Sequence, residues 1–170
     1  RVKNFPFLMG QGVWRGSENL DWNDTLEEVI KQGTLTVGFI GLAECLKAAI
    51  GVHHGESEEA QKLIADGVQE IVENYDVDGI HFDDYFYPTT DTAFDAKDYQ
   101  AYQKNGGKLS LAQWRRENVN SLIRKVYSVI KAEDEDIVFG ISPQGNMDNN
   151  YNNQFIDVKE WLTEDGYIDY

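Results

Sequence analysis

The sequence has little of four features, and each absence narrows what the protein can be. Its single cysteine, Cys45, excludes an internal disulfide framework. Its 15 Lys and Arg residues against 30 Asp and Glu give a net charge of −15. That balance argues against nucleic acid as a partner, because phosphate binding needs clustered basic residues. No apolar run approaches the roughly 18 residues of a membrane-spanning helix, and we find no signal-like segment.

The chain of 170 residues is long enough for one domain with a hydrophobic core. The acidic residues are unevenly distributed along it. Residues 1–62 carry 6 basic and 9 acidic side chains, a net charge of −3, whereas residues 63–170 carry 9 and 21, a net charge of −12. This shift hints that the two parts have different origins.

Periodicity and turn residues predict the secondary structure. Continuous apolar or β-branched runs predict strands over 4–14, 34–41, 77–82 and 137–142, with a further strand beginning at 167. Helices are predicted over 24–33, 42–51, 57–74, from the capping box at 110 onward, and over 155–166. The polar stretch 89–108 is predicted to be a long loop with one short helix, and 143–154 an Asn-rich loop.

Two of the predicted helices also indicate which residues enter the core. The helix that Ser57 caps has an apolar stripe with the period of an α-helix, and we expect this stripe to face inward. Its members are Ala60, Leu63, Ile64, Val68, Ile71 and Val72. Cys45 lies among apolar residues of the preceding helix, and we interpret it as a small core residue.

The alternation of strands and helices predicts an α/β fold with a parallel sheet covered by helices. A complete (β/α) barrel needs about 250 residues. We therefore expect a partial (β/α) barrel-like sheet, and an open doubly wound sheet is the alternative.

The stretch "DGIHFDDYFYP", residues 78–88, places two acids directly after a predicted strand. In α/β folds the functional residues gather at the carboxyl ends of the strands. Side chains alternate along a strand, so His81 and Asp83 are expected on one face and Asp84 on the other. Tyr85 and Tyr87 offer flat faces for stacking on sugar rings and hydroxyl groups for hydrogen bonds.

Three interpretations of the acid pair follow from these residues. Asp83 and Asp84 can be catalytic carboxylates of a glycosidase, with Asp83 the better candidate. They can instead cap the turn that follows the strand. Together with Asp78 they can also form a site for a hard cation, which needs several oxygen ligands.

Four segments of the second part carry a resemblance: "YDVDGIHFDDYFYP", "WRRENVNSLIRKVYSVIK", "FGISPQGN" and "VKEWLTEDGYIDY". In this order they resemble the glycosyl-hydrolase-like family ten, bacterial barrel proteins that cleave cell-wall or other polysaccharide glycans. The resemblance implies an oligosaccharide or polysaccharide partner, no cofactor or metal, and a secreted or cell-envelope location. It implies Asp83 and Asp84 as catalytic residues. The residues it implies for substrate binding are His81, Tyr85, Tyr87, Ser142, Gln144 and Asn146.

The sequence departs from this family in two respects. Many relatives have Ser-Pro-Phe-Gly where this chain has Ser142-Pro143-Gln144-Gly145, so the second wall of the site differs. Glycoside hydrolysis also needs two carboxyl groups, and the strand that ends at Ser142 is followed by no acid. The partner of Asp83 is then Asp84 or an acid outside this chain. A sugar-binding or structural fragment without turnover is the alternative function.

The first third resembles a different family. The segments "KNFPFLMGQGVW", "IKQGTLTVGFIGLAECLKA" and "HHGESEEAQK" resemble the anaerobic ribonucleoside-triphosphate reductase, a glycyl-radical enzyme. We therefore predict a chimera of a reductase-like βα segment, 1–62, and a glycosyl-hydrolase-like partial barrel, 63–170, packed as one domain. A fragment of the reductase is a third function, but Cys45 is the only cysteine available for its radical chemistry.

Overall fold

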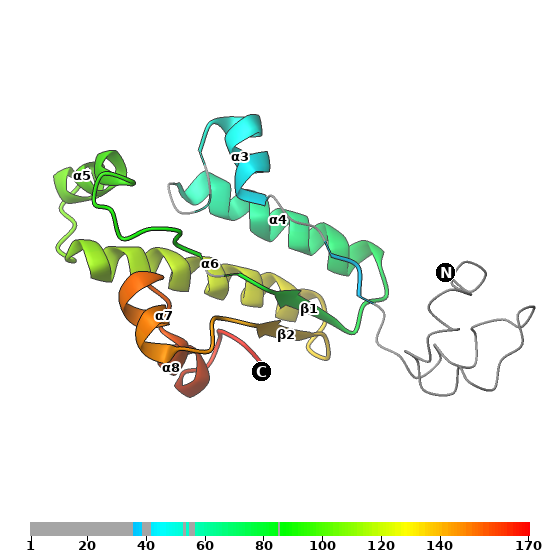
Figure 1. Ribbon diagram of the computed structural model, residues 1–170. Coiled ribbons are helices and arrows are strands. Elements are labelled where there is room, and N and C mark those ends of the chain that lie inside the picture. Colours follow the sequence, from blue (N-terminus) through cyan, green and yellow to red (C-terminus); the bar gives the residue numbers. More distant parts are fainter. Residues whose placement is uncertain (1–35, 39–41, 53, 55–56, 85) are drawn as a thin grey trace, which may run out of the picture. The chain divides into compact units, whose positions relative to one another are not determined.

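The elements that carry the candidate site all lie in one compact unit, Gly41–Tyr170. The computed structural model describes residues 36–38, 42–52, 54, 57–84 and 86–170 (Figure 1). The elements are α3 (Leu42–Ile50), α4 (Glu58–Asn74), β1 (Gly79–Phe82), α5 (Ala96–Lys104), α6 (Leu111–Glu133), β2 (Val138–Ile141), α7 (Met147–Asn153) and α8 (Val158–Thr163). The elements predicted over 4–14 and 24–33, and most of the strand over 34–41, lie outside the described residues.

Strands β1 and β2 form a parallel pair, as the sequence predicts. Ile80 pairs with Phe139 and His81 with Gly140, and the connection between the strands runs through α5 and α6. Such a crossover places the carboxyl ends of both strands at one edge of the sheet. The described residues therefore form a helix-rich α/β fold with a small parallel sheet, and the barrel stays a prediction.

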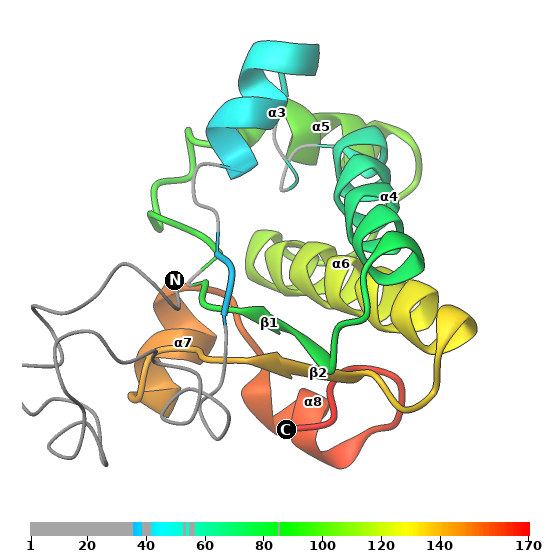
Figure 2. The same cartoon turned by 90° about the vertical axis from the view of Figure 1, so that its right-hand side faces the viewer.

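The core is formed by the sheet, by the two long helices α4 and α6, which pack side by side, and by α8 with the residues on either side of it (Figures 1 and 2). The predicted caps are confirmed: Ser57 accepts a hydrogen bond from the Ala60 amide, and Ser110 with Gln113 forms a capping box. The most buried apolar members of the core are Ala60, Ile123, Val126, Ile130, Phe139 and Ile156. No described helix is long and apolar enough to cross a lipid bilayer.

The core prediction was wrong for two residues. Leu63 is 41% exposed, because the buried stripe of α4 follows the four-residue spacing of Ala60, Ile64, Val68 and Val72 and leaves Leu63 beyond the edge of this stripe. Cys45 is also exposed. On α3 it is Leu46 that enters the core.

Two further differences concern the end of the chain. The stretch 143–154, predicted to be a loop, contains the helix α7. The strand predicted to begin at 167 does not form, although the Asp169 amide donates a hydrogen bond of 2.8 Å to the carbonyl of Phe139 on β2. The short helix predicted within 89–108 is confirmed as α5.

Candidate functional site

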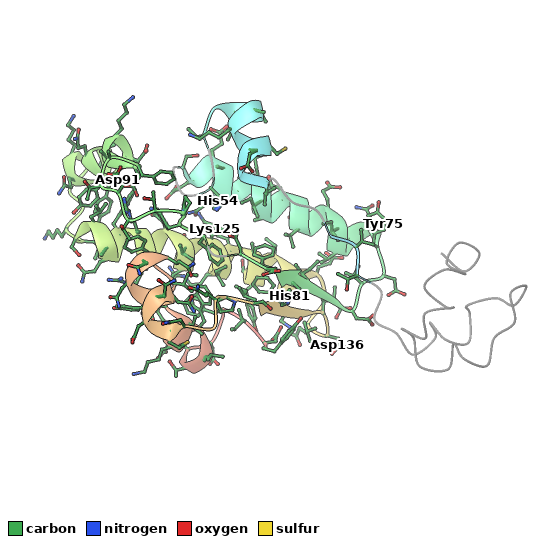
Figure 3. All side chains as sticks on the ribbon, viewed as in Figure 1. His54, Tyr75, His81, Asp91, Lys125 and Asp136 are labelled. Carbon is green, nitrogen blue, oxygen red and sulfur yellow. The ribbon has the colours of Figure 1, made fainter. Side chains whose placement is uncertain are left out.

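The candidate site is the edge of the sheet where β1 and β2 end. The Ser142 amide donates a hydrogen bond of 2.8 Å to the Phe82 carbonyl, so the loops after both strands start side by side. In Figure 3, Tyr75 and Asp136 lie near the amino ends of the two strands, while Asp91 lies beyond the carboxyl edge. The loop after β1 and the segment containing α7 therefore line the edge where α/β proteins carry their functional residues.

Asp83 and Asp84 follow β1 directly, and both are exposed. The Asp84 Oδ1 atom accepts a hydrogen bond of 2.8 Å from the Phe86 amide, which is the turn-capping role considered for the pair. Within the described part of the chain, the Asp83 carboxylate makes no hydrogen bond or ion pair. The described residues also contain no group of three His, Cys, Asp or Glu side chains arranged to hold a metal ion, so Asp78 does not join the pair in such a group.

His81 and Ser142, predicted from different segments, are brought together. The Nε2 atom of His81 lies 2.9 Å from the Ser142 hydroxyl, and its Nδ1 atom lies 3.2 Å from the Tyr170 hydroxyl. The ring of Tyr170 stacks on His81 and covers Gly140, where a Cβ atom would come within 2.3 Å of it. The two strand ends are therefore joined by a polar side-chain contact on the exposed face of the sheet.

Of the two tyrosines predicted to bind substrate, the structure describes only Tyr87. Tyr85 lies outside the described residues. Tyr87 is 5% exposed, and its ring packs edge-on against Phe155 and Phe94. Burial raises the pKa of Tyr87 to about 12, although a hydrogen bond from Asn118 opposes this effect. Its hydroxyl therefore stays neutral at physiological pH, and little of its ring is accessible for stacking.

Gln144 and Asn146 support α7 through their side chains. The Asn146 Oδ1 atom accepts a hydrogen bond of 3.0 Å from the Asn149 amide and so caps the helix. The Gln144 side chain accepts a hydrogen bond from the Asn149 side chain, and its backbone carbonyl accepts one of 2.6 Å from Asn150. Neither residue was predicted to have this structural role.

A buried arginine holds the loop after β1 in place, and no pattern in the sequence indicated it. Arg115, on α6, and Asp95 are each 1% exposed. Their side chains form a two-point ion pair, with Arg115 Nε 2.7 Å from one Asp95 oxygen and Nη2 2.6 Å from the other. The same Nη2 atom donates a hydrogen bond of 2.7 Å to the Asp91 carbonyl, and Nη1 one of 3.4 Å to that of Thr90.

Aromatic rings surround this guanidinium group. Its central carbon lies 4.8 Å from the centroid of Phe155 and 5.3 Å from that of Tyr87. Such cation–π contacts favour the charged group where water is excluded. The cluster joins the loop after β1, α6 and the turn between α7 and α8.

Two phenylalanines near the edge have a left-handed backbone: Phe86 (φ 57°), in the loop after β1, and Phe155 (φ 56°), between α7 and α8. This conformation is uncommon for bulky residues and persists only where the surroundings enforce it. Phe86 is held by an edge-on contact with Trp161, and Phe155 by its contacts with Tyr87 and Arg115. The contact with Trp161 holds Phe86, and the cluster around Arg115 holds Phe155.

An open groove of about 750 Å³ lies at this edge of the sheet. Its described lining residues come from the loop after β1 and from α7 with its carboxyl end: Asp84, Phe86, Tyr87, Pro88, Thr89, Thr90, Asn149, Asn153 and Gln154. A second cavity lies under the same loop and holds about 20 Å³, the room of a single water molecule. Of these two cavities, the groove is the one that is large enough for a ligand. Of its lining residues, sequence reasoning named Asp84 and Tyr87 and missed the amides of α7.

Comparisons with known proteins support two relationships. The family model described as "Glycosyl hydrolase-like 10" matches residues 48–170. The model described as "Anaerobic ribonucleoside-triphosphate reductase" matches residues 1–84. The two matched ranges overlap over 48–84, which includes α4 and β1.

Two curated relatives are similar to about two thirds of the chain. Glycosyl hydrolase YngK of Bacillus subtilis is 34% identical over 135 residues, which cover 69% of this chain and 26% of the relative. Glycosyl hydrolase DigH of Escherichia coli K12 is 37% identical over 127 residues, which cover 66% of this chain and 28% of the relative. The chain thus spans about a quarter of the length of these relatives.

Proposed function

The chain belongs to the glycosyl hydrolase-like 10 family, and from this premise we propose that it is part of a glycoside hydrolase acting on a bacterial cell-wall or other polysaccharide glycan. The observation that carries the proposal is an exposed acid pair at the carboxyl edge of a parallel sheet, where one member of the pair, Asp84, lines an open groove. Hydrolysis of a glycosidic bond uses a pair of carboxyl groups on either side of that bond.

Asp83 is the lead catalytic carboxylate in this proposal. It is exposed and makes no hydrogen bond within the described residues, so it is free to contact a substrate. Asp84 lines the groove, and its hydrogen bond from Phe86 fixes one of its oxygens. Within this chain, Asp84 is the candidate for the second catalytic carboxyl group. Because the chain spans about a quarter of its relatives' length, an acid from outside the 170 residues is the alternative.

The remaining residues form the walls in this proposal. His81 and Ser142 contact each other at the strand ends, and the Ser142 hydroxyl, which His81 holds, is offered to sugar hydroxyl groups. Gln144 and Asn146 stabilise α7, which forms the opposite side of the groove. Tyr87 supports the loop after β1 from the protein interior, since its hydroxyl accepts a hydrogen bond from the Asn118 side chain.

Release of reducing ends from peptidoglycan glycan strands and from α- and β-glucans tests this proposal. We expect Asp83→Asn to lower the rate by roughly 10²- to 10⁴-fold, the usual contribution of a positioned acid or base. Asp78→Asn is the matched control, because Asp78 is an exposed acid just before the amino end of the same strand. Equal rates for Asp83→Asn and the parent would remove Asp83 from catalysis.

A sugar-binding segment without turnover is the second candidate function. The observation that favours it is that β2 is followed by Ser142 and not by a second acid. Titration calorimetry with oligosaccharides, run beside the turnover assay, separates the two functions. Binding without release of reducing ends supports the second candidate, and turnover excludes it.

A further inference from the structure

The loop after β1 forms one wall of the groove, and its side chains make hydrogen bonds that shape local turns. Thr89 Oγ1 accepts a hydrogen bond of 3.1 Å from the Asp91 amide, and Asp91 Oδ1 accepts one of 2.9 Å from the Ala93 amide. Each of these bonds spans only two residues, so it bends the chain without connecting the loop to the protein core. The position of the wall therefore depends on a contact with another element.

Arg115 provides such a contact from α6. Its guanidinium group donates a hydrogen bond of 2.7 Å to the Asp91 carbonyl and one of 3.4 Å to the Thr90 carbonyl. The same group lies 5.3 Å from the centroid of the Tyr87 ring. Thr90 and Tyr87 both line the groove. One buried side chain thereby connects this wall to a long helix of the core.

The guanidinium group of Arg115 also reaches the opposite wall. It lies 4.8 Å from the centroid of Phe155, the residue directly after Gln154, which lines the groove at the carboxyl end of α7. The rings of Tyr87 and Phe155 are in turn 5.3 Å apart and meet edge-on. A displacement of the guanidinium group would therefore move both walls, and their spacing depends on where this group is held.

The burial of the ion pair indicates a role besides stability. Arg115 and Asp95 are each 1% exposed, so both charges lose their hydration on folding. Apolar side chains of similar volume can often replace a buried ion pair without loss of stability. They cannot donate hydrogen bonds to the carbonyls of Thr90 and Asp91. A planar guanidinium group can bind a carboxylate at two points and contact carbonyl oxygens at the same time.

We propose that Arg115 is a positioning residue that sets the spacing of the two walls of the groove, while Asp95 orients its guanidinium group. Because Arg115 is buried, it acts on a ligand only through Tyr87, Thr90 and Phe155. The proposal rests on the proposed hydrolase function for one statement, that the spacing of the walls affects turnover. That Arg115 orders both walls is independent of the reaction.

Two variants separate positioning from stability, and a third is the matched control. Arg115→Lys keeps a positive charge beside Asp95 but lacks the planar fork, so it cannot make the same set of hydrogen bonds. Arg115→Met combined with Asp95→Val removes both charges, and we expect it to melt within a few degrees of the parent. Arg124→Lys is the control, because Arg124 lies on the same helix, pairs with Glu117 and contacts the Tyr167 ring, but is not among the described residues that line the groove.

Hydrogen–deuterium exchange of the whole chain without ligand is the first measurement. We expect Arg115→Lys to accelerate the exchange of the hydrogen-bonded amides in 86–94 and 154–156 by about tenfold or more. Amides in the middle of α4 and α6 should exchange as in the parent, whereas a role in stability alone would accelerate all these amides together. The double variant should behave in the same way, and Arg124→Lys should leave both walls unchanged.

Release of reducing ends, measured as above, is the second measurement. We expect Arg115→Lys to lower kcat/KM by about 10²-fold, the effect of a displacement of about 1 Å in a site, and Arg124→Lys to leave it unchanged. The proposal is overturned if the walls of Arg115→Lys exchange as in the parent, if its core amides accelerate by the same factor, or if its turnover equals that of the parent. A parent that releases no reducing ends would instead contradict the hydrolase function, and the exchange of the two walls then decides the role of Arg115.

Discussion

Arg115 connects three parts of the chain that are far apart in the sequence. Its guanidinium group contacts Asp95 in the loop before α5, the ring of Tyr87 after β1, and the ring of Phe155 after α7. Both members of its ion pair are 1% exposed. Removing one member of a buried pair leaves the other charge without a partner, which is far more costly than losing an exposed pair.

We therefore predict that Asp95→Asn lowers the free energy of unfolding by about 3–5 kcal/mol. Urea denaturation followed by tryptophan fluorescence measures the change. Asp66→Asn is the matched control, because Asp66 pairs with Lys62 on the exposed surface of α4, and its loss should cost about 0.5 kcal/mol or less. Similar effects of the two substitutions would contradict a structural role for the buried pair.

Asp169 ties the residues after α8 to β2 and gives the protein a pH-dependent contact. Its carboxylate accepts a hydrogen bond of 2.7 Å from the Phe139 amide and forms an ion pair of 2.9 Å with Lys131. Burial alone would raise the pKa of Asp169. The hydrogen bonds from Lys131 and Phe139 outweigh it, so its pKa lies below the ordinary value of 3.8.

A carboxyl group with a lowered pKa in the folded state stabilises the fold at pH values above its unfolded pKa. This contribution is fully present above about pH 4 and is lost as the pH falls through the lower folded pKa. We predict that the difference in unfolding free energy between the parent and Asp169→Asn shrinks as the pH is lowered through this range. The difference between the two proteins is measured, and not the stability of either one alone, because other acidic residues also change their protonation in this pH range. A pH-independent difference would contradict the assignment.

The sequence indicates the positions of some residues at the edge of the sheet and not of others, and the difference has a physical reason. His81, Asp83 and Ser142 could be predicted because each stands at the end of an apolar strand. Arg115 could not, because an arginine in an amphipathic helix normally lies on the solvent side. Its partner Asp95 lies 20 residues earlier in a polar stretch without periodicity.

Among the elements, α4 and α6 were the most predictable. Their apolar residues recur with the period of a helix over four turns or more, and each begins with a side-chain cap. Within α4, Gly67 is exposed, and a Cβ atom added there meets no atom within 4 Å. Glycine at such a position loses more backbone entropy on folding than alanine does.

We predict that Gly67→Ala raises the free energy of unfolding by about 0.5–1 kcal/mol. Gly106→Ala is the contrasting variant, because Gly106 has a φ of 90°, and alanine there is strained even though its Cβ atom would have room. Thermal denaturation of the two variants should shift in opposite directions from the parent. A destabilised Gly67→Ala protein would mean that α4 is not helical at this position.

The helix α7 shows where a sequence pattern fails. Its sequence, MDNNYNN, is rich in asparagine, which has a low helix propensity and favours turns. The helix forms because Asn146 caps it and because the fully buried Asn150 donates to the Gln144 carbonyl. These are contacts of particular side chains, and no periodicity in the sequence reports them.

At the scale of the whole molecule, α4 and β1 lie in the range that both family models match. Their ranges overlap over 48–84, and α4 is continuous through Lys62 and Leu63, where the sequence predicts the junction of a chimera. Ala60 and Ile64, on either side of this position, are both buried. A junction there would thus be compatible with one uninterrupted core stripe, and its existence stays a prediction.

The proposed glycan site lies at the carboxyl edge of β1 and β2. Amide chemical-shift mapping by NMR, with cellotriose or N,N′,N″-triacetylchitotriose titrated into the ¹⁵N-labelled chain, tests it most directly. We expect the perturbed amides to cluster in 82–90 and 142–154, with Asn153 and Gln154 among them. Amides at the amino edge, in 75–79 and 134–138, should not move. Perturbations confined to the amino edge, or an unchanged spectrum at saturating sugar, would contradict it.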